Sequence, residues 1–186
     1  MPGRLPSPRP VNPHKGVGRH GQFGDRLLRR LREIDALHGV TASAGLQGTG
    51  GATGVGDATD SELVTIGRAH EFGIGVPERP WLRTAAATYG RDWVGGFRHA
   101  AKQRIKGDQL GSVGTIRQVG VAMVADVQKT IREGPWEDLA DSTKARRIAK
   151  HGSKGRKVTP LIDTGQMIQS VRAALEEPGR TPELIG

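Results

Sequence analysis

The most regular hydrophobic pattern lies between residues 112 and 133. Apolar side chains recur there every three or four residues, which is the spacing of one face of an α-helix. Gly134-Pro135 follows and ends the pattern, because proline cannot continue a helix. The segment therefore predicts a helix with one buried face. That face comprises Val113, Ile116, Val119, Gly120, Met123, Val124, Val127 and Ile131.

Three further segments predict helices. Alanine content favours a helix over 81–105, although three internal glycines weaken it. A leucine-rich face favours a helix over 25–38, with Asp25 as its cap and Gly39 as its stop. A shorter helix is predicted over 142–150, within a polar and basic region.

Strands are predicted in three places. Residues 40–47 and 62–73 are read as strands, the second from a short alternation of side chains, and the glycine-rich segment 48–61 separates them. This order predicts an antiparallel pair joined by a long flexible loop. A last strand is predicted over 170–176.

Together these elements predict an α+β fold, in which helices pack on one face of a small antiparallel sheet. The predicted domain spans 25–177, and a C-terminal tail follows over 178–186. Residues 1–24 hold five prolines, four Lys or Arg and no acidic residue. Because proline removes backbone donors and like charges repel, this segment is predicted to be a flexible, extended basic arm.

Composition limits the classes of function. Only 4% of the 186 residues are aromatic and 28 are glycine, which predicts a modest core. The absence of cysteine excludes disulfides, thiolate metal sites and cysteine nucleophiles. No apolar run reaches the roughly 18 residues of a membrane span, so we expect a cytosolic protein without membrane contact. The net charge of +9 favours polyanions or acidic surfaces as partners.

Residues 160–165, PLIDTG, contain the Asp-Thr-Gly of aspartic proteases. Those enzymes need two carboxylates that share a proton. This chain has no second such string, only 23 residues follow Asp163, and Gln166 stands where the protease pattern has a small residue. We therefore expect Asp163 and Thr164 to cap the helical turn that begins at Gly165 or Gln166. The side chains predicted to pack on the long helix are Leu161, Ile162, Met167 and Ile168.

No other motif predicts catalysis, a cofactor or a metal site. The glycine-rich segment lacks the Gly-Lys-Ser/Thr of a phosphate loop and the G-x-G-x-x-G of a dinucleotide-binding turn. None of the six histidines stands at metal-ligand spacing from another. His70 and Glu71 are adjacent, but neighbours on the predicted strand would point to opposite faces. We therefore expect no enzyme activity and no cofactor.

The densest positive charge lies between residues 144 and 157, which contain no acidic side chain. These cations favour contact with phosphates or with an acidic partner, without reading bases. A solvated loop on a basic protein accounts for the same pattern equally well. No aromatic residue lies in the cluster, which disfavours base stacking. The basic residues are Lys144, Arg146, Arg147, Lys150, Lys154, Arg156 and Lys157.

Three strings follow one another along the chain: IGRAHEFGIGVPERPWLR at 66–83, PWEDLADSTKARRIAKHG at 135–152 and PLIDTGQMIQSV at 160–171. Together they resemble the neck and tail-completion proteins of long-tailed bacteriophages, of the tail-component or virion-morphogenesis type. In the first string, the matching residues are Glu71, Phe72, Gly73, Pro77, Arg79, Pro80, Trp81, Leu82 and Arg83. In the other two, they are Trp136, Leu139, Thr143 and Pro160 to Gly165, with Asp163, Thr164 and Gly165 at the core of the last.

The resemblance spans residues 25–175 and has three departures. Trp81 stands where phenylalanine is common, the glycine-rich segment is long, and the basic arm has no counterpart in the family. The departures leave the roles of the arm and of the glycine-rich segment open.

The resemblance implies a structural virion protein of the phage neck. Such subunits are expected to form a ring homo-oligomer, commonly a hexamer, between head-connector proteins and tail-tube or terminator proteins. Packaged DNA passes through the ring, and non-specific contact with it is expected. We expect the arm, the glycine-rich segment and residues 144–157 to make the assembly contacts. The position in the stack (terminator, completion ring or stopper) stays open, and a basic DNA-binding accessory or regulatory protein is the alternative.

Overall fold

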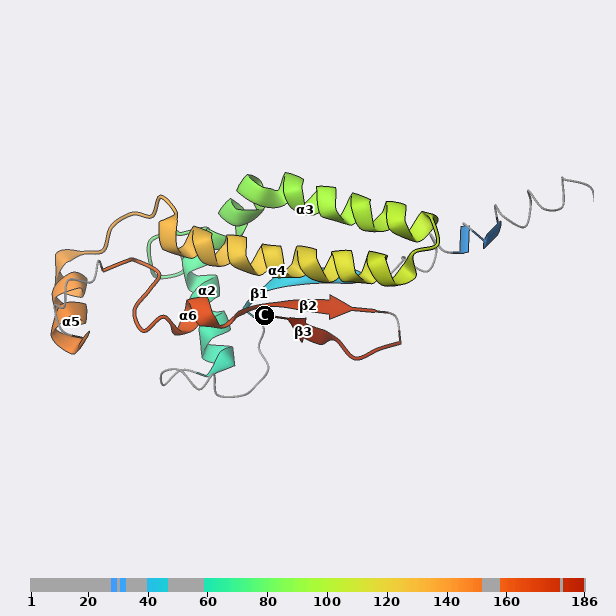
Figure 1. Cartoon of the computed structure of the whole chain (residues 1–186). Helices are drawn as coiled ribbons and strands as arrows, with labels where there is room; N and C mark the ends of the chain where they lie inside the picture. Colours follow the sequence, from blue (N-terminus) through green and yellow to red (C-terminus); the bar gives the residue numbers. More distant parts are fainter. Residues whose placement is uncertain are drawn as a thin grey trace, which may run out of the picture.

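A computed structural model describes much of the chain between Val40 and Ile185 (Figure 1). The predicted arm over 1–24, most of the predicted helix over 25–38 and nearly all of the glycine-rich segment lie outside the described residues. Four residues of that predicted helix are described and are helical: Leu28, Arg29, Leu31 and Arg32. The described residues are 28–29, 31–32, 40–46, 59–151, 158–177 and 179–185.

A three-stranded antiparallel sheet forms one layer of the molecule. Its strands, in order across the sheet, are β1 (Thr41–Leu46), β2 (Val171–Glu176) and β3 (Glu183–Ile185). β1 pairs with β2 from Thr41 opposite Glu176 to Leu46 opposite Val171. The first and last predicted strands are therefore confirmed, whereas β3 is a strand that the sequence pattern does not predict.

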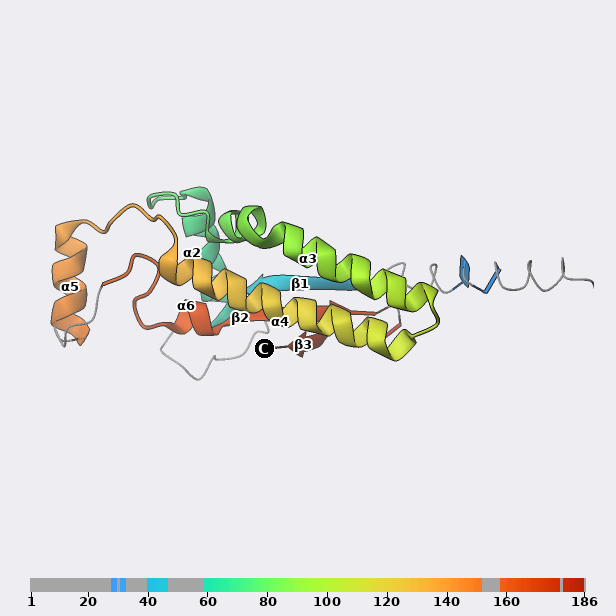
Figure 2. The same ribbon diagram turned by 45° about the horizontal axis from the view of Figure 1, so that its top comes forward.

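Two long helices cover one face of this sheet, so the α+β fold is confirmed (Figures 1 and 2). α3 (Trp81–Ile105) has the predicted bounds and runs antiparallel to α4 (Gln109–Glu133), which lies next to the strands. α4 begins slightly earlier than predicted, because Asp108 caps it. The Asp108 carboxylate accepts a hydrogen bond of 2.8 Å from the Gly111 N–H.

The segment predicted as a strand over 62–73 is instead a helix, α2 (Asp60–Phe72). Thr59 caps this helix reciprocally with Glu62. The Glu62 N–H donates to Thr59 Oγ1, and the Thr59 N–H donates to the Glu62 carboxylate at 2.7 Å. This capping box satisfies two backbone donors that a helix start otherwise leaves without partners.

Burial along α2 has a helical period. Leu63, Gly67 and Glu71 are buried at a spacing of four residues, whereas a strand buries every second residue. The predicted pairing of this segment with the first strand is therefore wrong. The partner of β1 is β2, which follows it by more than 120 residues.

The core lies between the helical hairpin and the sheet, and it extends to α2 and to the short helix α6 (Gln166–Gln169). The predicted packing of the 161–168 segment on α4 is confirmed. The predicted face of α4 is buried at most positions, with Val113 and Met123 only partly buried. The main cluster comprises Leu63, Trp81, Ala85, Val124, Val127, Ile131, Leu161, Met167, Ile168, Val171 and Ala173.

The helix predicted over 142–150 is confirmed as α5 (Asp141–His151). It stands apart from the hairpin at one end of the molecule, as both ribbon views show (Figures 1 and 2). None of its described side chains belongs to either hydrophobic cluster. Burial of apolar surface therefore does not fix the position of α5.

Candidate functional site

The end of α2 and the start of α3 are tied together by Glu71. Its side chain is only 7% exposed and accepts hydrogen bonds from the Leu82 N–H at 2.9 Å and the Arg83 N–H at 3.1 Å. The Arg83 Nε also donates to it, at 3.0 Å. Glu71 therefore provides α3 with the cap that Pro80, at the N-cap position, does not supply.

The turn between these helices depends on glycine. Gly73 follows α2 with a φ of 68°, in the left-handed region that glycine adopts without strain. The chain then reverses, and Trp81 inserts into the core with 4% of its surface exposed. Its indole Nε1 donates to the Gly67 carbonyl at 3.1 Å, so the ring fixes α3 against α2.

Arg79 joins the first sequence string to the second. This side chain is 2% exposed, and its guanidinium donates to the Glu137 carbonyl from Nη2 at 3.1 Å. On the other side, Arg79 Nη1 lies 3.4 Å from His70 Nδ1 and also reaches the Pro77 carbonyl. A buried guanidinium needs several acceptors, and these backbone groups provide them.

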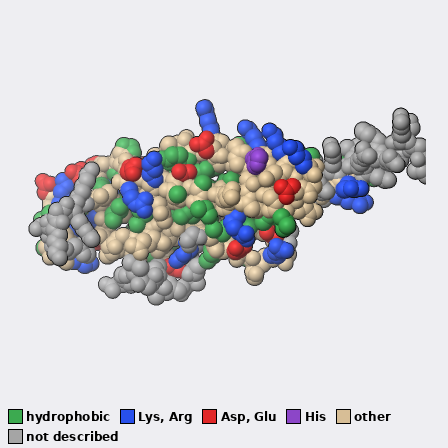
Figure 3. Space-filling model, viewed as in Figure 1, with side chains coloured by type: hydrophobic (Ala, Val, Ile, Leu, Met, Phe, Trp, Pro, Cys, Tyr) green, Lys and Arg blue, Asp and Glu red, His purple; other side chains and the backbone are tan. Residues whose placement is uncertain are grey.

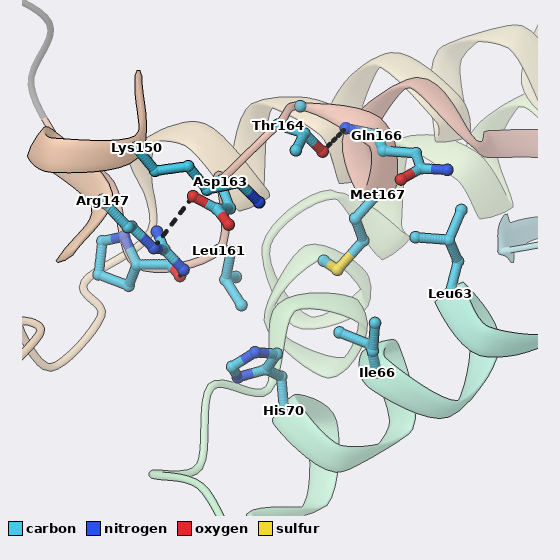
Figure 4. A pocket seen from close by; sticks show the side chains of 12 residues that line it. Leu63, Ile66, His70, Arg147, Lys150, Leu161, Asp163, Thr164, Gln166 and Met167 are labelled. Atoms are coloured by element: carbon cyan, nitrogen blue, oxygen red, sulfur yellow. Dashed lines mark hydrogen bonds and ion pairs between the residues drawn. The ribbon is translucent and has the colours of Figure 1, made fainter. Parts of the chain in front are cut away.

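Arg147 joins the second string to the third (Figure 4). Its guanidinium donates to the carbonyls of Thr159 at 2.9 Å, Ile162 at 3.0 Å and Pro160 at 3.3 Å. Its Nε lies 3.4 Å from the Asp163 carboxylate. One α5 side chain therefore holds the turn that precedes α6.

The Asp-Thr-Gly turn partly follows the prediction. Thr164 Oγ1 accepts a hydrogen bond of 3.2 Å from the Gln166 N–H, as predicted, and Gly165 occupies the N-cap with a φ of 81°. The ion pair of Asp163 with Arg147 is not predicted from the sequence.

An open cavity of about 250 Å³ lies where α2, α5 and the 160–167 segment meet (Figure 4). Apolar side chains of α2 and α6 line one part of it, and His70, Arg147 and Lys150 line another. Among the described residues that line it, Asp163 is the only carboxylate. It faces a guanidinium rather than the second carboxylate that aspartic protease chemistry needs.

His70 is electrostatically disfavoured as a cation at this place. Burial lowers the pKa of its imidazole, and the guanidinium groups of Arg79 and Arg147 lower it further. The neutral ring can accept a hydrogen bond from Arg79. Because 62–73 is helical, the sequence-based argument that His70 and Glu71 point to opposite faces of a strand does not apply. They still differ in role, since Glu71 caps α3 and His70 faces the cavity.

The predicted basic cluster is not a uniform set of surface cations. Lys144 pairs with Asp138 at 2.7 Å, and Arg147 binds backbone carbonyls. Arg146 and Lys150 are exposed on α5. The remaining members, Lys154, Arg156 and Lys157, lie outside the described residues.

Within the described ranges, no group of three or more His, Asp or Glu side chains could hold a metal ion. Among the described helices, none combines the length and apolarity that a membrane span requires. Comparison of the chain with protein-family models, curated proteins and solved structures found no match.

Proposed function

We propose that this chain is a structural subunit of the neck of a long-tailed bacteriophage. In this proposal it forms part of a ring at the head–tail junction, through which DNA passes. The observation that carries the proposal is the convergence of all three sequence strings on one end of the molecule. There they hold a helix, α5, outside the hydrophobic core.

Few contacts within the subunit hold α5 in its position. It is anchored through Arg147 and through the ion pair of Lys144 with Asp138, while Ile148 is 42% exposed. Exposed ion pairs of this kind add little stability, because water and salt screen the charges. A neighbouring subunit that covers Ile148 would supply the missing apolar contact.

The α2–α3 turn adds a second apolar surface near the same end. Phe72, Ile74 and Val76 are 59%, 63% and 37% exposed, although the Arg83 guanidinium lies over the Phe72 ring. An open depression of about 370 Å³ lies beside this turn, between α2 and β1. Clusters of exposed apolar side chains of this kind mark protein–protein contacts.

These surfaces suit a ring. A closed ring requires heterologous contacts, in which one surface of each subunit meets a different surface of the next. α5 and the depression between α2 and β1 are two different surfaces of one subunit. The ring partner is thus a second copy, and head-connector and tail proteins would stack above and below.

Genetic removal tests this proposal. In the phage genome that encodes the chain, a stop codon in the gene should yield DNA-filled heads and separate tails in electron micrographs. Joined, infectious particles without this protein would contradict the proposal.

Complementation then tests the role of α5. Wild-type protein should restore joining, and Ile148→Glu should restore it far less, because the substitution places a charge in the contact. Leu184→Glu is the matched control, since Leu184 on β3 is 45% exposed, close to the value for Ile148, and lies outside α5 and the α2–α3 turn. Equal rescue by both variants would show that α5 does not take part in the contact between subunits.

A further inference from the structure

The solvent face of α3 carries a line of basic side chains. Arg91, Arg98, Lys102 and Lys106 are separated by seven, four and four residues, so they fall on one side of the helix. All four are exposed, and the buried Ala100 lies on the opposite side of the same helix. Figure 3 shows Lys and Arg side chains gathered over α3 toward the turn into α4. We call these four residues the α3 stripe.

Among the described residues, the α3 stripe has no carboxylate partner. Within the described residues, none of its four side chains forms an ion pair with a carboxylate. The helix dipole favours cations near the C-terminus of α3, which accounts for Lys102 and Lys106. That effect is confined to the last turn, so it does not account for Arg91 and Arg98.

The dimensions of the α3 stripe match a nucleic acid backbone. Fifteen residues separate Arg91 from Lys106, which corresponds to about 22 Å of helix. One strand of a DNA duplex carries a phosphate about every 3.4 Å along its axis, so this length lies beside several phosphates. Long, mobile cations adapt to such a row without reading bases.

Other anionic surfaces fit less well. A helix that binds a membrane buries an apolar face in the lipid, but the apolar face of α3 lies in the protein core. The exposed positions of α3 near the stripe include Thr88, Gly95 and Val94, and Val94 is 46% exposed. One valine is a small apolar anchor for a lipid surface, so the exposed face of α3 is mainly charged and polar.

We propose that the α3 stripe binds the phosphate backbone of duplex DNA without sequence preference. The inference deepens the proposed function and rests on it for the source of the DNA, which is the genome crossing the neck. It moves the DNA contact away from residues 144–157. Two of the described cations of that segment, Lys144 and Arg147, are engaged within the subunit.

Two matched double variants test the inference. Arg98→Gln with Lys102→Gln removes one Arg and one Lys from the α3 stripe. Arg146→Gln with Lys150→Gln removes the same charges from exposed positions of α5. Glutamine is a good helix former, and circular dichroism melts verify that both variants remain folded.

The measurement is the fluorescence anisotropy of a short labelled duplex of mixed sequence, titrated with each protein at several salt concentrations. The α3 variant should bind at least about tenfold more weakly at low salt and reduce the slope of log affinity against log salt by about 2. The α5 variant should lose less than about threefold, through net charge alone. Equal losses in the two variants, or wild-type affinity in the α3 variant, would overturn the inference.

A competitor distinguishes DNA from an acidic protein. Poly-glutamate should displace the duplex only at far higher charge concentration; displacement at equal charge would overturn the assignment to DNA.

The two proposals can also fail separately. If gene removal leaves head–tail joining intact while the α3 variant loses DNA affinity, the neck function is contradicted and DNA binding by the α3 stripe is supported. If gene removal separates heads from tails and the α3 variant binds DNA normally, only the DNA binding by the α3 stripe is contradicted.

Discussion

At the scale of single residues, three charged side chains act as ligands for the backbone. Glu71 binds two N–H groups at the start of α3, Arg79 binds the Glu137 carbonyl, and Arg147 binds three carbonyls before α6. Each bond joins segments that are distant in sequence or separated by a turn. Hydrogen bonds to charged groups contribute about 1.5–3 kcal/mol each, so these residues stabilise the junction more than ordinary surface ion pairs.

Glu71→Ala should lower the free energy of unfolding by about 2–4 kcal/mol, because it removes a cap and leaves buried donors without an acceptor. Chemical denaturation measures the change. Glu71→Gln keeps an acceptor oxygen and should lose about half as much. Glu78→Ala, which removes an exposed partner of Arg83, is the control and should change stability by less than about 1 kcal/mol. A loss in Glu71→Ala no larger than in this control would contradict the capping role.

His70 should make stability depend on pH in a defined range. Its folded pKa lies below the ordinary value of 6.5, so the unfolded chain binds a proton that the folded protein does not. Stability is therefore fully present above about pH 6.5 and falls as the pH drops from there toward the folded pKa. The charged groups that face the ring are Arg79, Arg147, Lys150 and Asp163.

Denaturation curves measured between neutral and mildly acidic pH test this dependence. His70→Gln should flatten the curve in that range, whereas His99→Gln, at an exposed position of α3, should leave it unchanged. An unchanged slope in His70→Gln would show that another group carries the dependence.

At the scale of helices and strands, α3 and α4 approach each other closely at one glycine. A Cβ on Gly96 would overlap Val119 Cγ2, whereas a Cβ on the adjacent Gly95 would meet no atom within 4 Å. Substitution of Gly95 therefore tests helix propensity alone, and substitution of Gly96 tests propensity together with packing.

Gly95→Ala should raise the free energy of unfolding by about 0.5–1 kcal/mol, because alanine favours the helix more than glycine does. Gly96→Ala should lower it by about 1–3 kcal/mol, because the added methyl group overpacks the contact with Val119. Thermal melts of the two variants give the comparison directly. Stabilisation by Gly96→Ala would contradict the close approach of the helices.

The sequence predicts the long helices because each contains its own signal. The period of the apolar residues indicates α4, and the alanine content indicates α3. Neither signal depends on distant residues. α2 is different, because the short alternation near Leu63 resembles a strand. The string Thr59-x-x-Glu62 is a capping box that marks a helix start and should have outweighed that alternation. The partner of β1 could not be predicted, since strand pairing across most of the chain leaves no local pattern.

The sequence contains the three strings of the candidate site, but it does not predict the contacts between them. An arginine in a turn gives no signal of the carbonyl that it will bind, so the roles of Arg79 and Arg147 appear only in the fold. The charge-dense segment 144–157 is visible in the sequence because its cations are close together along the chain. The α3 stripe is spread over sixteen residues and becomes a single surface only on a helix.

At the scale of the whole molecule, the described part of the chain is elongated. The α3–α4 hairpin lies over the sheet, with α5 at one end and the α3–α4 turn toward the other (Figures 1 and 2). The α3 stripe runs along the outer side of the hairpin. In the proposed ring, contacts through α5 would leave this long side available to face the channel.

If, as proposed, a long-tailed phage encodes this chain, a cryo-EM map of its neck tests the central claim most directly. We predict a ring at the head–tail junction whose repeating density fits a helical hairpin on a three-stranded sheet. α5 should contact the adjacent copy, and α3 should face the channel. A neck map with no density that fits this fold, from particles that lack the protein by mass spectrometry, would contradict the account.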